Sequence, residues 1–174
     1  MTAPFRIEPL SGNHDRSRFS SGSAPLDRYF REQASQDIKR RIASCFVAVS
    51  AETKEVAGFY TLTAASIALD ALAAETIRKL PRYPVVPAAL LGRLAVAGNH
   101  QGKGLGGVLL SDAVLRVARA ELGVFAVLVD AKDAAAQRFY EHYGFTLLPG
   151  EEHRLCLPIA LALRQFEART QRPA

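Results

Sequence analysis

Gln101-Gly102-Lys103-Gly104-Leu105-Gly106-Gly107 lies between a predicted strand and a predicted helix, and no other stretch says more about the fold. Successive glycines allow positive φ and close approach of the backbone, so several N–H groups can converge on one anion. The following helix adds its own unpaired N–H groups and the positive end of its dipole. Lys103 adds a movable positive charge. We predict a cradle for phosphate or pyrophosphate, and the alternative is a tight helix-entry turn without a ligand.

Two other phosphate-binding patterns fit this stretch less well. A Walker A loop requires GxxxxGK[ST], and the sequence contains no such string. Gly102, Gly104 and Gly107 do satisfy GxGxxG, and Asp130 follows at about the distance of a ribose-binding acid. The dinucleotide fingerprint, however, follows its strand directly and opens its domain. Here residues 98–101 intervene, and the 44 residues after Asp130 are too few for the remaining βαβ units.

Strand and helix patterns alternate on both sides of the glycine stretch. Strands are predicted at 5–8, 45–49, 56–62, 90–96, 124–130, 145–148 and 154–157, and helices at 24–42, 71–80, 108–122 and 134–142. Three prolines exclude a regular helix from 80–87, which we predict to be an ordered loop. The run 124–130 is nearly all apolar, as in a central strand covered on both faces. The class is α/β with a mixed sheet, in one domain over 1–174 whose residues 163–174 form a frayed basic tail.

Composition and charge narrow the function classes. Apolar residues make up 49% of the chain and charged residues 22%, as in soluble globular domains rather than disordered chains. The sequence shows neither a signal-peptide pattern nor a bilayer-spanning apolar run, so we expect a cytoplasmic protein without membrane contact. A net charge of +5 favours phosphate-bearing partners. Cys45 and Cys156 lie in apolar runs, which predicts buried thiols and no metal site.

The same glycine stretch also contains Gln101-x-x-Gly104-x-Gly106. In this respect the chain resembles the GNAT superfamily of N-acetyltransferases, whose acetyl-CoA loop has the pattern [Arg/Gln]-x-x-Gly-x-[Gly/Ala]. Leu94-Ala95-Val96 resembles the strand that pairs with the pantetheine arm, and Ala134–Phe145 resembles the family's late helix. The resemblance covers about residues 45–157. It implies a GNAT fold, with a mostly antiparallel central sheet whose middle strands splay apart and with helices on its flanks.

A narrower resemblance concerns 26–30, 80–84 and 91–96, which are similar to segments of the GNAT toxins of toxin–antitoxin pairs. This resemblance implies that the protein acetylates the α-amino group of aminoacyl-tRNA and thereby blocks translation. It also implies a ribbon-helix-helix antitoxin as partner, and a homodimer.

The resemblance assigns roles to individual residues. Tyr140 matches the catalytic tyrosine, which would protonate the leaving thiolate, because a phenol with a pKa near 10 is protonated at pH 7. Main-chain N–H groups near Val96 would polarise the thioester carbonyl. Tyr143, one helical turn from Tyr140, is a rival acid or a packing residue and is included among the acetyl-CoA contacts. The complete set of predicted acetyl-CoA contacts is Leu94, Ala95, Val96, Gln101, Gly102, Lys103, Gly104, Leu105, Gly106, Gly107 and Tyr143.

Basic side chains form two clusters that could bind the RNA backbone through charge. The first lies along the predicted helix 24–42 and the second around the proline-rich loop. The candidates for contact with tRNA are Arg28, Lys39, Arg40, Arg41, Arg78, Lys79, Arg82 and Arg93. The alternative for each is a solvated surface.

Three other functions remain open from the sequence. The first is a GNAT enzyme that acetylates a protein N-terminus or a small amine. The second is a non-catalytic module that binds CoA, and the third is a dinucleotide-binding oxidoreductase.

Overall fold

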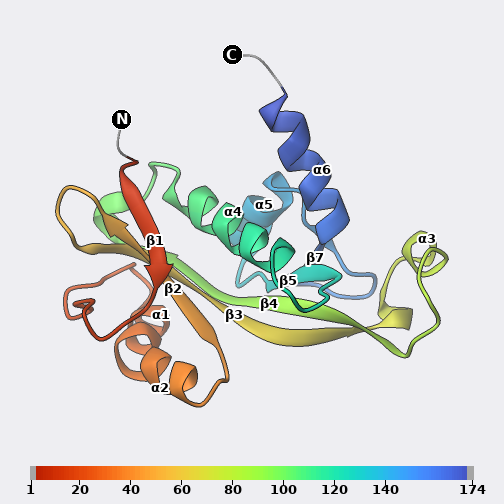
Figure 1. The fold of residues 1–174 in the computed structure, drawn as a ribbon, viewed down its shortest axis with the longest axis horizontal. Coiled ribbons are helices and arrows are strands. Elements are labelled where there is room, and N and C mark those ends of the chain that lie inside the picture. Colours follow the sequence, from red (N-terminus) through yellow and green to blue (C-terminus); the bar gives the residue numbers. More distant parts are fainter. Residues whose placement is uncertain (1–2, 172–174) are drawn as a thin grey trace. The chain divides into compact units, whose positions relative to one another are not determined.

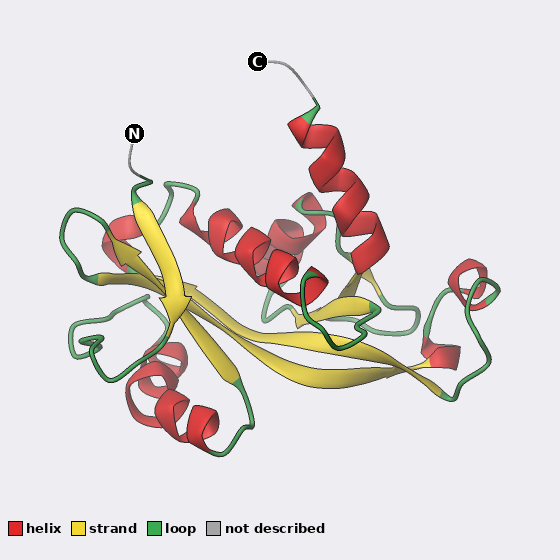
Figure 2. Ribbon diagram, in the orientation of Figure 1, coloured by secondary structure: helices red, strands yellow, loops and turns green. Residues whose placement is uncertain are grey.

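The structure, a computed structural model, describes residues 3–171 of the 174-residue chain (Figure 1). Its strands are β1 (Phe5–Pro9), β2 (Ser44–Ser50), β3 (Val56–Ala68), β4 (Val85–Val96), β5 (Ala126–Asp130), β6 (Thr146–Leu147) and β7 (Arg154–Pro158). Its helices are α1 (Ala24–Arg28), α2 (Ala34–Lys39), α3 (Ala74–Ile77), α4 (Leu105–Ala118), α5 (Ala134–His142) and α6 (Ile159–Thr170). A π-helical turn, η1 (Tyr29–Gln33), joins α1 to α2, and the 3-10 turns η2 (Leu69–Ala71) and η3 (Gly98–His100) are short (Figure 2).

The strands form a mixed seven-stranded sheet in the order β1-β2-β3-β4-β5-β7-β6, which confirms the predicted fold class. Neighbours β1/β2, β2/β3, β5/β7 and β6/β7 are antiparallel. The chain divides into two compact units. Unit 1 comprises the described residues up to Thr63 together with Leu91–Ala113, and unit 2 comprises Ala64–Leu90 together with the described residues from Val114 onward. Within residues 3–171, no helix is long and apolar enough to cross a membrane.

In unit 1, the first half of strand β3, residues 56–61, is buried on both faces. The ring of Phe59 stacks on Phe30 of η1 at 4.2 Å between centroids. The adjacent Tyr60 points the other way, and its hydroxyl donates to Asp112 Oδ2 of α4 at 2.5 Å. Because side chains alternate along a strand, the α1–η1–α2 segment and α4 lie on opposite faces of β3.

The predicted helix at 24–42 ends earlier than expected. It runs from α1 through η1 to Lys39, and Arg41 then adopts a φ of 59°, outside the helical region. Ile42, the last residue of the predicted helix, is 59% exposed. At the other end Ser23 is the N-cap, and its side chain makes no capping bond.

In unit 2, two further predictions are wrong. Strand β4 begins at Val85, so residues 85–87 belong to a strand rather than to the loop. Pro87 is tolerated there, and its carbonyl accepts the N–H of Phe125 at 2.9 Å. The frayed tail is instead helix α6 as far as Thr170, because its buried Ala162 and half-buried Leu161 and Phe166 anchor it. Residues 172–174 of the predicted tail lie outside the described residues.

Candidate functional site

The glycine stretch forms a loop after η3 in unit 1 and runs into the first turn of α4. Gly102 and Gly104 have φ of 73° and 83°, as predicted for glycines that shape a cradle. A Cβ atom on either residue would have no heavy atom within 4 Å, so the loop is open to solvent. Among residues 3–171, no backbone–backbone hydrogen bond outside the helices and strands uses the N–H groups of residues 102–107. Unpaired amides at a helix N-terminus suit a phosphate or pyrophosphate.

Gln101 stabilises this loop through its side chain. Its Nε2 donates to the carbonyl oxygens of Ser21 at 2.7 Å and of Val96, at the end of β4, at 2.9 Å. Lys103 Nζ donates to the carbonyl oxygen of Asn99 at 3.0 Å. The Gln101 amide therefore fixes the path of the loop, while the exposed Lys103 keeps its charge beside the unpaired amides.

Helix α4 reaches its position because β3 carries a glycine. Leu105 at the start of the helix is 2% exposed, so its side chain anchors the helix and only its backbone can face a ligand. A Cβ on Gly58 would lie 2.8 Å from Leu109 Cδ1 and 2.9 Å from the carbonyl oxygen of Ala95. Sequence reasoning missed Gly58, although a glycine inside an apolar strand often marks such an approach.

The predicted pantetheine-binding residues are the last three residues of strand β4, just before η3. Ala95 is buried, whereas Leu94 and Val96 are half-buried. The carbonyl of Val96 is taken by Gln101, and the N–H of Ala97 donates to Ala57 at 2.8 Å.

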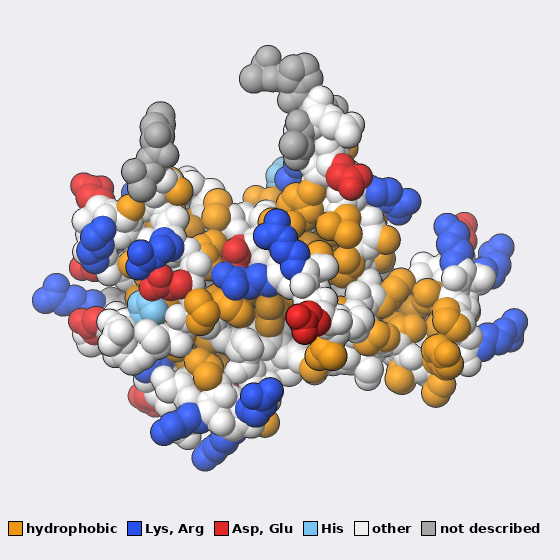
Figure 3. All heavy atoms as spheres, viewed as in Figure 1, with side chains coloured by type: hydrophobic (Ala, Val, Ile, Leu, Met, Phe, Trp, Pro, Cys, Tyr) orange, Lys and Arg blue, Asp and Glu red, His pale blue; other side chains and the backbone are white. Residues whose placement is uncertain are grey.

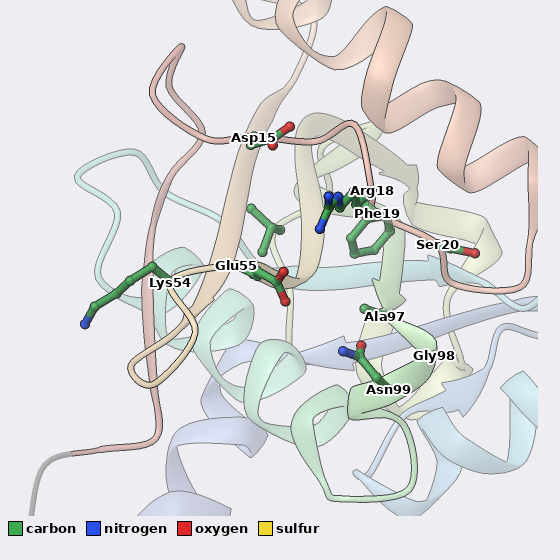
Figure 4. A pocket seen from close by; sticks show the side chains of 10 residues that line it. Asp15, Arg18, Phe19, Ser20, Lys54, Glu55, Ala97, Gly98 and Asn99 are labelled. Atoms are coloured by element: carbon green, nitrogen blue, oxygen red, sulfur yellow. The ribbon is translucent and has the colours of Figure 1, made fainter.

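A hollow of about 460 Å³ lies beside η3 (Figure 4). Figure 4 shows Arg18, Glu55 and Asn99 directed into it and Lys54 directed away. The lining of the hollow includes two acidic residues, Asp15 and Glu55, and two basic residues, Arg18 and Lys54. The charge of the hollow therefore does not favour an anion. The loop at 101–107 is the better anion site.

Arg93 lies on strand β4 in unit 1, where an aromatic ring holds its side chain. Its guanidinium lies 3.5 Å from the centroid of the Tyr29 ring in η1, a cation–π contact. The Tyr29 hydroxyl donates to Asp37 Oδ2 at 2.9 Å, and Gln33 Nε2 donates to Asp37 Oδ1 at 3.0 Å. These two bonds hold the pKa of Asp37 below its usual value, and burial raises the pKa of Tyr29. The partners of Arg93 were not foreseen, because nothing in the local sequence pairs a strand residue with a helix.

The other basic candidates are exposed, as the charge pattern suggested. Unit 1 carries Arg28 on α1, Lys39 at the end of α2, and Arg40 and Arg41 just beyond it. Arg31 of the same segment already has a partner within the protein, since its Nη1 donates to the carbonyl of Phe19 at 2.7 Å. Unit 2 carries Arg78, Lys79 and Arg82 after α3.

Tyr140 lies on α5 in unit 2, in the helix whose bounds match the prediction. The Asp133 carboxylate caps the helix start by accepting the N–H of Ala136 at 2.8 Å. The Tyr140 ring meets Phe139 and the buried Phe145 edge-to-face, at 5.2 and 5.6 Å between centroids. Burial raises the pKa of Tyr140 to about 12, so its hydroxyl stays protonated at neutral pH.

Tyr143 follows at the C-cap of α5 and is half-buried. Its ring contacts Phe139 at 5.2 Å and His142 at 5.1 Å between centroids. The chain then turns through Gly144, whose φ is 94°, and the side-chain amide of Gln165 on α6 covers that glycine.

Other titratable groups have structural partners. Arg154 binds both carboxylate oxygens of Asp130, at 2.8 and 2.9 Å, and lowers the pKa of Asp130. Asp130 is thus paired across β5 and β7, which counts against the dinucleotide interpretation. Cys45 and Cys156 are free buried thiols, as predicted, and burial raises their pKa values to about 12 and about 11. In the described part of the chain, no group of three or more His, Cys, Asp or Glu side chains could hold a metal.

Comparison with known proteins defines the class. Residues 41–147 match the family model described as "Acetyltransferase (GNAT) domain". The chain belongs to the GNAT acetyltransferase family, and it is an acetyltransferase by class.

Within that family, two curated relatives carry names that describe them as a toxin or a probable toxin. A tRNA-acetylating toxin of Mycobacterium tuberculosis is 37% identical over 158 residues, covering 90% of this chain and 91% of the relative. The probable toxin TacT of Sinorhizobium fredii is 32% identical over 164 residues, covering 88% and 91% respectively.

Solved structures agree with this placement. AtaT complexed with acetyl-methionyl-tRNAfMet is 27% identical, with a TM-score of 0.86 over 93% of this chain and 99% of that one. AtaTR bound with acetyl-CoA is 28% identical, with a TM-score of 0.81 over 94% of this chain and 98% of that one.

Proposed function

We propose that this chain is a cytoplasmic toxin that transfers an acetyl group from acetyl-CoA to the α-amino group of aminoacyl-tRNA and so blocks translation. The observation that carries the substrate class is the 37% identity to a tRNA-acetylating toxin across nine-tenths of the chain. A ribbon-helix-helix antitoxin neutralises the toxin, and the active form is a homodimer.

The loop of unit 1 fits the donor. Acetyl-CoA supplies the activated acetyl group, and its pyrophosphate matches the unpaired amides at residues 102–107 and the charge of Lys103. Leu94, Ala95 and Val96 offer backbone groups to the pantetheine arm. N–H groups near Val96, other than the Ala97 N–H that donates to Ala57, polarise the thioester carbonyl.

The acceptor needs little help from a base. An α-amino group has a pKa of about 7.7–8.0 and is partly neutral at pH 7. As its nitrogen bonds to the acetyl carbon, the carbon–sulfur bond breaks and the amine gives up a proton to water. Tyr140 Oη donates its proton to the departing sulfur, and the resulting phenolate takes a proton back from water. The raised pKa of Tyr140 keeps that proton available across the physiological range.

The exposed cations of both units suit an RNA acceptor. Arg28, Lys39, Arg40 and Arg41 in unit 1, and Arg78, Lys79 and Arg82 in unit 2, offer charge to phosphates. Arg93 differs from them, because its stacking on Tyr29 fixes the plane of the guanidinium before any phosphate arrives.

The test is acetyl transfer from labelled acetyl-CoA to total aminoacylated tRNA, with wild type, Tyr140→Phe and Tyr143→Phe side by side. Tyr140→Phe keeps the ring packing and removes only the proton donor, so we expect transfer to fall by about 10²- to 10⁴-fold. Acetyl-CoA affinity, measured by calorimetry, should stay within twofold of wild type. Tyr143→Phe removes the hydroxyl of the rival acid at the C-cap of the same helix, and we expect it to lower transfer far less than Tyr140→Phe does.

Three results would count against the proposal. Label in protein N-termini or small amines, with none in aminoacyl-tRNA, would replace the substrate class. Full activity in Tyr140→Phe would remove the assigned acid. Acetyl-CoA binding without transfer to any amine would leave a non-catalytic CoA-binding module.

A further inference from the structure

Tyr83 in unit 2 is a large aromatic side chain left in solvent. It is 65% exposed, although the residues around it are anchored. Leu80 and Ile77 are partly buried against the core cluster that contains Val86 and Leu72. The ring of Tyr83 therefore lies between two anchor points and contributes nothing to that core.

The backbone holds this ring on a rigid loop. The N–H of Tyr83 donates to the carbonyl of Pro81 at 2.9 Å, which closes a tight turn. The carbonyl of Pro84 accepts the N–H of Leu69 at 3.0 Å and fastens the loop to η2. Proline fixes φ at both 81 and 84, so presenting the ring to a partner costs little conformational entropy.

Basic residues lie close to Tyr83 in the sequence. Arg78, Lys79 and Arg82 are all exposed and lie within five residues of Tyr83. Among residues 3–171, none of these three cations forms an ion pair. Figure 3 shows Lys and Arg side chains gathered around α3, next to hydrophobic side chains.

We infer that Tyr83 stacks on an unpaired base of the RNA substrate while Arg78, Lys79 and Arg82 bind the adjoining phosphates. An exposed aromatic ring among unpaired cations matches a single-stranded nucleotide, which offers a π face and an anionic backbone together. A protein surface would match the ring but would need a dense acidic patch for the cations. The inference rests on the proposed function and adds a base contact to the charge contacts.

The experiment measures the Kd for aminoacyl-tRNA, its KM in acetyl transfer and the salt dependence of binding, in wild type and four variants. Tyr83→Ala should weaken binding and raise KM by about 5- to 150-fold, the usual range for a lost base–aromatic stack. Tyr83→Phe keeps the ring and should stay within twofold of wild type. Leu122→Ala removes another exposed hydrophobic side chain of unit 2, which is 82% exposed, and is the matched control.

Salt dependence separates stacking from charge. Arg82→Gln should flatten the plot of log Kd against log salt by about 0.7–0.9, because one phosphate contact is lost. Tyr83→Ala should weaken binding at every salt concentration and leave that slope unchanged. Acetyl-CoA affinity should not move in any of the four variants.

Each contrary outcome has a distinct meaning. Wild-type transfer to aminoacyl-tRNA with unchanged Kd and KM in Tyr83→Ala overturns this inference alone. No transfer by wild type overturns the proposed function and this inference with it. A dimer that dissociates in Tyr83→Ala, with unaltered tRNA affinity, makes the ring an interface between copies and overturns base stacking.

Discussion

Replacing Gly58 by alanine should disturb both stability and the donor site, although Gly58 touches neither substrate. The new Cβ would lie 2.8 Å from Leu109 Cδ1 and 2.9 Å from the carbonyl oxygen of Ala95. Normal carbon contacts are about 3.5–4.0 Å, so something must move. Leu109 is fully buried, and the Ala95 oxygen is backbone, so neither can swing away cheaply. Such overpacking costs about 1–3 kcal/mol.

Leu109 belongs to helix α4, so a displacement that relieves the overlap moves this helix, whose first turn carries the amides at 105–107. A domain of this size loses about 2–4 °C in Tm per kcal/mol, so we expect a drop of roughly 2–12 °C by calorimetry. We also expect roughly 10-fold weaker acetyl-CoA binding, since charge-assisted hydrogen bonds to phosphate depend on geometry. Gly12→Ala is the control, because a Cβ there meets nothing within 4 Å. Wild-type Tm and acetyl-CoA affinity in Gly58→Ala would refute the reasoning.

Two further predictions concern the loop and the acid. Gly104→Ala places a side chain at a φ of 83° and should cost about 1–2 kcal/mol, seen in calorimetry as weaker acetyl-CoA binding. Equal affinity in the variant would show that the loop does not need that conformation. Acetyl transfer should rise with pH as the amine loses its proton, and then stay level to about pH 10, because Tyr140, with its pKa raised to about 12, remains protonated. A decline between pH 8 and 9 would mean that a different group is the acid.

Strong local signals in the sequence predicted much of this molecule. Helix α5 has the predicted bounds, since Gly144, whose φ is 94°, follows it and stops the helix. The glycines at 102 and 104 take the predicted positive φ for the same local reason. The roles of Tyr140, Tyr143 and the basic residues remain predictions, because they depend on substrates.

Other features came from contacts between distant segments. Strands β3 and β4 extend beyond their predicted ends, because a strand continues as far as its neighbours offer hydrogen bonds. Helix α6 forms in place of the predicted frayed tail because the side chain of Ala162 is buried.

By itself, the sequence determined the fold class, the glycine loop and the helix that carries Tyr140, since each depends on φ preferences and periodicity within a short window. Only the tertiary structure assigned Gly58 its role beneath α4 and Arg93 its place on Tyr29. The tertiary structure also decided that Tyr83 is exposed. These three features depend on which surfaces the packed chain brings into contact or leaves in water, and no spacing along the sequence encodes that.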